Sequence, residues 1–214
     1  MRRLFTPILA GALTLGFAAQ VAAEPVTPKE AKKLLFKGPK ISVQVLSPEG
    51  VAPEIMAQVE AIAASLTKPE IIDTWEKMGF SLAYYGAIAI KPDRPVNPAN
   101  SMTMSNNLHS PQAAANAAAR ACNALPGPDC VVVALITPKR FKPRDFTLSQ
   151  AATDGFRENW GKPDAPQYLA FSPSSGTWLI AKGAGADAVA LERCNEKAVE
   201  GGGTADCQIA IAEE

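Results

Sequence analysis

The sequence predicts an α+β fold in which a helix–strand–strand–helix–strand unit occurs twice, with mostly antiparallel sheets and disulfide staples. The first observation is a succession that repeats. An Ala-rich segment ending in cysteine is followed by an Asp-Cys-apolar segment in 109–138, and the same succession returns in 183–214. The second observation is that apolar residues change between the helical and the strand period along the chain. The third is a set of four cysteines, an even number.

Composition places the chain among ordinary globular proteins. Its 214 residues are 47% hydrophobic and 20% charged, which suits one compact domain or two small ones. The formal net charge is zero and no basic block is present, so nucleic acid is not expected as a partner. The 18 prolines and 15 glycines predict many loops and edge strands.

The first 23 residues have the layout of a secretory signal peptide. Arg2 and Arg3 form a basic start, an apolar run follows over 4–19, and small residues at 21–23 precede Glu24. A membrane anchor is the alternative, but the run is short and no second apolar segment of about 20 residues follows. We therefore expect residues 1–23 to be cleaved, no transmembrane segment in the mature chain, and a periplasmic or secreted location.

Residues 24–66 are predicted to form an N-terminal helix–strand–helix extension. The first helix, over 25–36, has Thr27 as a cap, Pro28 at its first position and Glu30 at the capping-box position. Alternation of apolar and polar residues predicts a strand over 41–46, and an apolar stripe at helical spacing predicts a helix over 53–66.

Residues 67–138 are predicted to form the first repeat unit. Ser110 is a good helix cap followed by Pro111, so the Ala-rich helix is expected to start there. The β-branched run after Cys130 is typical of an interior strand. The expected elements are a helix over 69–78, a strand over 80–90, a loop over 91–100, a strand over 101–108, a helix over 112–125 and a strand over 130–136.

Residues 139–214 are predicted to form a connector and the second unit. A turn at 173–176 separates two short apolar runs and indicates a hairpin. The expected elements are a helix over 147–160, strands over 168–172 and 177–181, a helix over 185–198 and a strand over 207–212.

The two units align without gaps along their Ala-rich helices. Setting Cys194 over Cys122 also brings together three further sets of residues: Ala114 with Ala186, Ala118 with Ala190, and Asp129-Cys130 with Asp206-Cys207. In the preceding strands, Tyr85 is set on Tyr168. Chance similarity between Ala-rich helices is the alternative, but the cysteine and Asp-Cys coincidences occur in the same order, which favours duplication.

The repeat selects one of the three ways to pair four cysteines. If each unit is a copy, each holds its own bond, Cys122 with Cys130 and Cys194 with Cys207. A redox pair is the alternative, but it normally needs C-x-x-C spacing, whereas seven and twelve residues intervene here. Both bonds are therefore expected to be structural.

His109 is the one histidine and the main candidate for chemistry. A small hydrolase could use it as a base, but the chain lacks the G-x-S-x-G motif. One histidine and four paired cysteines leave no zinc set. Gly183 and Gly185 open a helix without a phosphate-loop pattern. We expect no catalytic, cofactor-binding or metal residues, and interpret His109 as a loop or capping residue.

The run of basic residues over 139–144 is the remaining charged feature. Its members are Lys139, Arg140, Lys142 and Arg144. A solvated surface is the expected reading, and weak contact with an anionic envelope surface is the alternative.

The chain resembles two groups of exported bacterial proteins. The Tyr-x-Ala strand, the Ala-rich helix ending in Cys and the Asp-Cys strand resemble an exported domain family of unknown function. The segments AKKLLF, YYGAIAI and CVVVALITPKRFKPRDF resemble short exported alphaproteobacterial proteins often labelled 5-aminolevulinate synthase. The resemblance covers most of 25–214 and implies a small exported α+β protein. Such a synthase uses pyridoxal phosphate on a lysine, and no lysine here lies in a matching motif.

These features predict a non-catalytic binding or envelope-interaction module. The alternatives are an enzyme, either the labelled synthase or a small hydrolase using His109, and a purely structural stress or inhibitor protein. A deep pocket that joins His109 to a serine and a carboxylate would favour the hydrolase. A flat patch without a cavity would favour an interaction module.

Overall fold

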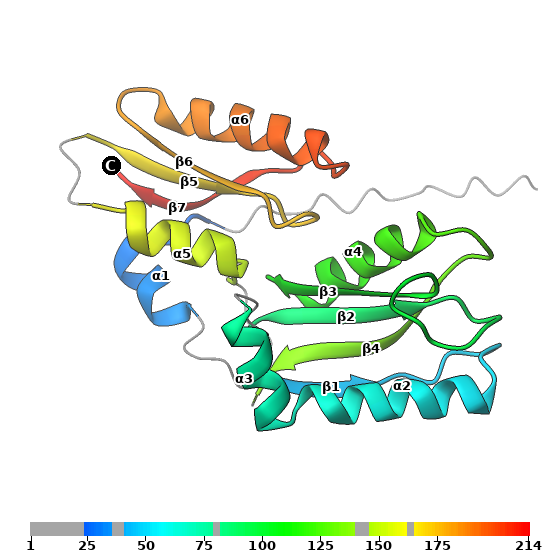
Figure 1. Cartoon of the computed structure of the whole chain (residues 1–214). Coiled ribbons are helices and arrows are strands. Elements are labelled where there is room, and N and C mark those ends of the chain that lie inside the picture. Colours follow the sequence, from blue (N-terminus) through cyan, green and yellow to red (C-terminus); the bar gives the residue numbers. More distant parts are fainter. Residues whose placement is uncertain (1–23, 36–40, 79–81, 140–145, 162–164) are drawn as a thin grey trace, which may run out of the picture.

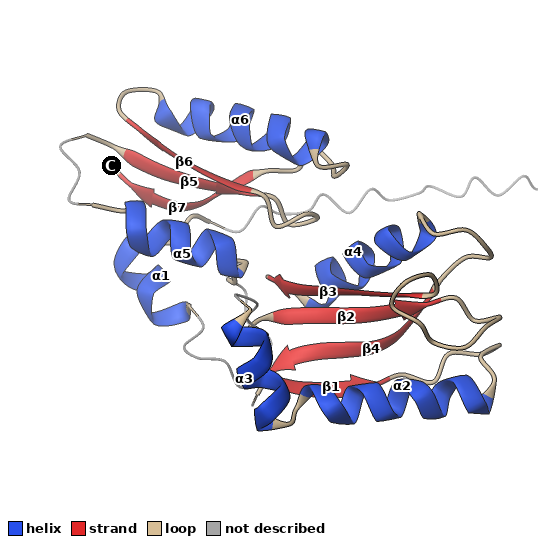
Figure 2. Cartoon of the chain, viewed as in Figure 1, coloured by secondary structure: helices blue, strands red, loops and turns tan. Residues whose placement is uncertain are grey.

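Two antiparallel sheets flanked by helices make up an α+β fold (Figures 1 and 2). The computed structural model describes residues 24–35, 41–78, 82–139, 146–161 and 165–214. The expected signal peptide, and the basic run apart from Lys139, lie outside these ranges. No helix within the described ranges is long and apolar enough to cross a membrane.

The first sheet has four strands in the order β1-β4-β2-β3. The strands are β1 (Ile41–Val45), β2 (Tyr85–Ile90), β3 (Met102–Leu108) and β4 (Val131–Pro138). Helices α2 (Pro53–Leu66) and α3 (Pro69–Lys77) precede β2, and α4 (Pro111–Asn123) joins β3 to β4. All three pairings are antiparallel.

Side chains of different size cover the two faces of this sheet. On one face the buried isoleucines of β2, Ile88 and Ile90, share a cluster with Val59 of α2. On the other face Ala87 and Ala89 pack against Ala114 and Ala118 of α4. Because alanine has no bulk beyond Cβ, α4 can lie close to the strands, as its composition indicates.

The second sheet has three strands in the order β6-β5-β7. The strands are β5 (Gln167–Phe171), β6 (Trp178–Lys182) and β7 (Gln208–Glu213). Helix α6 (Ala186–Glu200) packs through Ala190 and Cys194 onto one face. Helices α1 (Pro28–Leu34) and α5 (Gln150–Asn159) contribute to an apolar cluster with Leu169 and Ile211 on the other.

Each sheet carries one disulfide bond in the pairing expected from the repeat. Cys122 is bonded to Cys130, and Cys194 to Cys207, with Cα atoms 6.0 Å apart in both. Each bond joins the Ala-rich helix to the residue before the next strand. Such bonds are consistent with an oxidising compartment outside the cytosol.

An asparagine beside each disulfide adds a second link, at equivalent positions in the two aligned units. The Cys130 amide donates to Asn123 Oδ1 at 2.7 Å, and the Cys207 amide donates to Asn195 Oδ1 at 2.9 Å. Each asparagine directly follows the helix cysteine. The same side-chain bond therefore holds the same strand start in both sheets.

The registers of the two sheets differ from the sequence alignment by two residues. The pairing of β2 with β4 shifts between Ile88 and Ala89, and that of β5 with β7 shifts between Leu169 and Ala170. Matching these irregularities places Ala87, rather than Tyr85, over Tyr168. Strand register follows the pairing pattern, which single aromatic residues do not determine.

The segment expected as an N-terminal extension is divided between the two sheets. Val26 bridges Ile211 in parallel, with Val26 N donating to Ala210 O at 3.0 Å, so this end lies on β7. Strand β1 pairs with β4 of the first sheet. Thr27 forms the expected capping box with Glu30.

The boundaries of several elements differ by a few residues from those expected. The helix expected from Thr147 begins at Gln150, because the Ser149 hydroxyl accepts from Ala152 N and caps it. The strand expected over 80–90 begins at Tyr85. Ser110 caps α4 as expected, accepting from Ala113 N at 3.1 Å.

Candidate functional site

His109 lies where the two halves of the chain meet. It follows β3, and its ring packs edge-on against Phe171 of β5 with the centroids 4.6 Å apart. The Thr147 hydroxyl, just before α5, donates to the His109 carbonyl at 2.7 Å. The side chain is only 6% exposed. His109 therefore joins the first sheet to the second.

The surroundings of His109 keep its ring neutral. Burial lowers its pKa to about 4, against the opposing effects of a hydrogen bond to the Pro173 backbone and the charge of Asp206. Among the described residues, its Nδ1 atom has no hydrogen-bond partner. The nearby Ser149 hydroxyl donates to the Gly176 carbonyl instead. In the described part of the chain, no serine, threonine or cysteine side chain is hydrogen-bonded to the His109 ring.

The cavity beside His109 is small. Its volume is about 140 Å³, and its wall includes Phe146, Phe171 and Pro173. Pockets that enclose small ligands usually measure about 300–1,000 Å³. The cavity is thus narrow, and its wall also includes the polar residues Glu24, Thr147 and Gln208.

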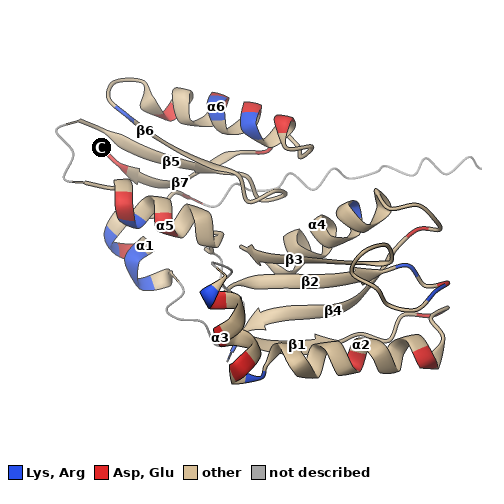
Figure 3. Cartoon of the chain, viewed as in Figure 1, with Lys and Arg blue, Asp and Glu red and all other residues tan. Residues whose placement is uncertain are grey.

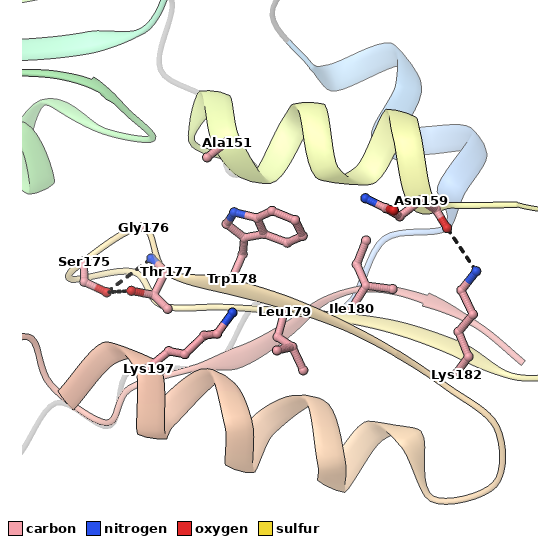
Figure 4. Close-up of a pocket in the computed structure, with 10 residues that line it drawn as sticks. All are labelled: Ala151, Asn159, Ser175, Gly176, Thr177, Trp178, Leu179, Ile180, Lys182 and Lys197. Atoms are coloured by element: carbon pink, nitrogen blue, oxygen red, sulfur yellow. Dashed lines mark hydrogen bonds between the residues drawn. The ribbon is translucent and has the colours of Figure 1, made fainter. Parts of the chain in front are cut away.

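A larger groove lies along β6, between α5 and α6 (Figure 4). Its volume is about 750 Å³. Ala151 and Asn159 of α5 form one wall, Lys197 of α6 contributes to the other, and β6 with the turn before it forms the floor. The lining residues of the turn and β6 are Ser175, Gly176, Thr177, Trp178, Leu179, Ile180 and Lys182.

The floor of the groove is an edge strand. In the described sheet β6 pairs with β5 and with no other strand. The opposite edge differs, because β7 is bridged there by Val26. An edge strand presents backbone N–H and C=O groups that can pair with another chain.

Hydrogen bonds at the two ends of β6 determine which of its backbone groups face the groove. Ser172 N donates to Thr177 O, and Gly183 N donates to Pro166 O, both at 2.9 Å. The register between β5 and β6 has no shift. Bonded and non-bonded pairs alternate in antiparallel sheets, so Leu179 and Ala181 bond to β5. The N–H and C=O groups of Trp178, Ile180 and Lys182 point outward.

A glycine allows α5 to lie directly over β6. A Cβ atom added to Gly155 would lie 1.9 Å from Cη2 of Trp178. The indole ring thus occupies the space of the missing side chain. In Figure 4 Trp178 and Ile180 point toward α5, whereas Leu179 points toward α6. The two walls of the groove consequently meet different faces of β6.

The charges that line the groove are positive. Lys182 Nζ donates to the Asn159 carbonyl at 3.0 Å, and no hydrogen bond or ion pair holds the Lys197 side chain among the described residues. No carboxylate is among the lining residues. Charged residues otherwise gather on helices and loops, and the described strands contain only Lys182 and Glu213 (Figure 3).

The turn at one end of the groove is held by a network of hydroxyl groups. The Ser172 hydroxyl donates to Asp206 Oδ1 at 2.5 Å, and Ser174 N donates to Asp206 Oδ2 at 3.0 Å. The Ser175 hydroxyl lies 2.7 Å from that of Ser172 and 2.9 Å from that of Thr177. These bonds fix the turn that leads into β6.

A second hollow of about 440 Å³ adjoins the first. The two share Ala151, Ser175 and Gly176 as a common wall. Asn106 and Asp154 are among the other residues that line the second hollow. The groove along β6 therefore continues past the start of α5 toward the end of β3.

The described residues contain no group of three or more His, Cys, Asp or Glu side chains that could hold a metal ion. No sequence motif marks the β6 edge. The run WLIAK after a turn indicates a strand, but only the sheet order shows that this strand lies at an edge.

Comparisons with protein-family models, curated proteins and solved structures found no match.

Proposed function

We propose that the protein is a non-catalytic binding module that takes up an extended peptide by strand addition to β6. The observation that carries the proposal is the row of outward backbone groups at Trp178, Ile180 and Lys182. It lies in a groove whose volume, about 750 Å³, is in the range of ligand pockets. Main-chain bonds to such an edge supply affinity, and pockets for alternate side chains supply specificity.

The two walls of the groove would select alternate side chains of the peptide. In an added strand every second side chain shares a face with Trp178 and Ile180, next to α5. The intervening side chains share a face with Leu179, next to α6. Both faces are largely apolar, so β-branched residues suit the strand that binds.

We also propose that this binding takes place outside the cytosol. The signal-peptide layout of residues 1–23 and the two disulfide bonds support export to the periplasm or beyond. Mass measurement of the protein recovered from the periplasm of an expressing bacterium checks this. A mature chain that starts at Glu24 is expected, and an uncleaved chain retained in the cytosol would contradict export.

Internal duplication is a further part of the proposal. Both sheets have the same succession of helix, strand, strand, helix and strand, the same disulfide position and the same asparagine bond. In the first sheet β3 occupies the position of β6. Its sequence contains more polar residues than that of β6, including Thr103, Ser105 and Asn106, which makes that edge less suited to apolar peptides.

A neutral model peptide tests strand addition. The probe is acetyl-Thr-Val-Thr-Val-Thr-Val-amide, titrated into ¹⁵N-labelled protein while amide chemical shifts are recorded. Shifts are expected first at residues 178, 180 and 182. A peptide N-methylated at its third residue lacks a main-chain donor and should bind at least ten-fold more weakly. Shifts confined to other surfaces, or equal binding of the methylated peptide, would contradict the proposal.

The substitution Ile180→Pro is the matched test on the protein side. Proline removes an N–H that faces the groove and leaves the bonds to β5 in place. Ile180→Ala removes a similar amount of side chain and keeps the N–H. Proline is expected to weaken binding of the model peptide several-fold more than alanine. Equal weakening would assign the effect to the side chain alone.

A further inference from the structure

We infer that the segment bound at β6 is an acidic one from a partner protein, with two carboxylate side chains five positions apart. This inference rests on the proposed strand addition and adds the chemistry of the partner. The observation behind it is that Lys182 and Lys197 approach the groove from opposite sides, near its two ends (Figure 4).

Lys182 lies on the α5 side of the groove, at the end opposite Thr177. It is the last residue of β6 and lies on the same face as Trp178 and Ile180, since strand side chains alternate. Its bond to the Asn159 carbonyl uses one of the three donors of the ammonium group. The remaining donors can bind a carboxylate on that face.

Lys197 lies on the α6 side of the groove, near its Thr177 end. Its side chain is exposed and rises from α6 toward the start of β6. The nearby Thr177 hydroxyl lies 2.9 Å from that of Ser175 and belongs to the hydroxyl network of the turn. A carboxylate here would meet the ammonium group of Lys197.

The other charged residues of α6 do not cancel the positive charge that Lys182 and Lys197 give the groove. Ala190, Cys194 and Ala198 face the sheet. Helical periodicity then turns Glu192 and Glu196 outward, whereas Arg193 and Glu200, which carry opposite charges, share the flank of Lys197. On α5, Asp154 lies in the adjoining hollow and pairs with Arg157 at 3.6 Å.

The alternation of side chains fixes the spacing. An antiparallel strand that spans Lys182 to Thr177 has six residues, and its first and sixth side chains lie on opposite faces. The first meets Lys182 on the α5 face and the sixth meets Lys197 on the α6 face. Carboxylates four positions apart would lie on one face and could reach only one lysine.

A second copy of the chain suits the groove less well. Two β6 strands paired antiparallel about a two-fold axis would bring the lysine-lined ends of the grooves together. Lysine at a sheet edge opposes such pairing. The same charges attract an acidic strand, and this selects the partner over the second copy.

Three capped peptides test the inference on the full mature protein by calorimetry at low salt. They are Glu-Thr-Val-Thr-Val-Glu, its Gln-Thr-Val-Thr-Val-Gln analogue, and Glu-Thr-Val-Thr-Glu-Val, which has the composition of the first with the wrong spacing. Exposed ion pairs each contribute a few-fold at most. The first peptide should therefore bind about five- to ten-fold more tightly than the glutamine peptide, with the third between them.

Charge variants of the protein assign the preference to the two lysines. In Lys182→Gln/Lys197→Gln the preference for the first peptide should disappear while the glutamine peptide binds as before. Lys68→Gln, an exposed lysine before α3, is the matched control and should keep the preference. Equal binding of all three peptides to the unmodified protein, or a preference that survives in the double variant, would overturn the inference.

Two further outcomes distinguish this inference from the proposal beneath it. If no peptide shifts the amides of 178, 180 and 182, strand addition fails and the inference fails with it. If the glutamine peptide binds there as well as the acidic one, only the inference fails. Sedimentation that shows a dimer, dissociated by Ile180→Pro, would assign the edge to a second copy and overturn the acidic partner.

Discussion

Gly155 shows how one residue shapes the groove. Its missing side chain leaves room for the Trp178 ring, which would lie 1.9 Å from an added Cβ. This contact sets how closely α5 approaches β6. The residue had no distinguishing signal in the sequence, because a glycine within a helical pattern only lowers helix propensity.

Gly155→Ala should destabilise the protein by about 2–3 kcal/mol, because the added methyl group overpacks the contact with Trp178. Gly161→Ala is the control, since nothing lies within 4 Å of its added Cβ. Urea unfolding followed by tryptophan fluorescence measures both. Equal stability of the two variants would show that α5 does not pack on Trp178 as described.

His109 makes stability depend on pH. Burial lowers its pKa from 6.5, the ordinary value for histidine, to about 4 in the folded chain. The unfolded chain therefore binds the proton first as pH falls. The free energy of unfolding should decline from pH 6.5 and level off near pH 4, by about 3 kcal/mol in all from this group.

The difference in stability between the wild type and His109→Phe isolates this effect, because the two proteins share every other titratable group. Unfolding by urea at pH 4.5, 5.5, 6.5 and 7.5 gives the comparison. The wild type should lose more stability than the variant between pH 6.5 and 4.5. Parallel profiles would show that the ring is accessible to solvent.

At the scale of elements, each disulfide and its asparagine act as one unit. The covalent bond and the side-chain bond hold the same strand start, at Cys130 in the first sheet and Cys207 in the second. The sequence alignment contained both features. Only the cysteines were recognised, because an asparagine after a helix cysteine has many possible partners until the strand is placed.

Removing either disulfide should cost about 2–3 kcal/mol on the loop-entropy account. The bonds close loops with sequence separations of 8 and 13, so Cys194→Ala/Cys207→Ala should cost slightly more than Cys122→Ala/Cys130→Ala. Thermal unfolding of both double variants measures the order. Loss of the folded state in one variant alone would mean that the sheets differ in their dependence on the bond.

The alternating orientation of β6 predicts opposite effects for neighbouring prolines. Ile180→Pro removes an outward N–H and should keep the fold, whereas Ala181→Pro removes a bond to β5 and should destabilise by about 3 kcal/mol or more. Circular dichroism during urea unfolding compares the two. The reverse order of stability would contradict the assignment of outward groups.

At the scale of the whole molecule, local signals predicted more than long-range ones. The capping box at Thr27 and the cap at Ser110 depend on neighbouring residues, and both are present in the structure. The division of residues 24–66 between two sheets depends on distant pairings, such as Val26 with Ile211. Sequence periodicity carries no information on which sheet a strand joins.

The candidate site also depends on long-range pairing, which the sequence does not reveal. His109 is a reactive residue type, but in the structure its ring is buried and packs against Phe171. The β6 groove arises because a three-stranded sheet leaves one edge open between two helices. No residue type in the sequence indicates a site of this kind, and only the order of the strands shows where it lies.

Hydrogen exchange of the β6 amides tests the central proposal most directly. In the free protein, the amides of Leu179 and Ala181 should exchange slowly, because they bond to β5, whereas those of Trp178, Ile180 and Lys182 should exchange fast. Saturating acetyl-Glu-Thr-Val-Thr-Val-Glu-amide should slow the second group at least ten-fold and leave the first unchanged. Fast exchange of the second group that persists under saturation would contradict strand addition at β6.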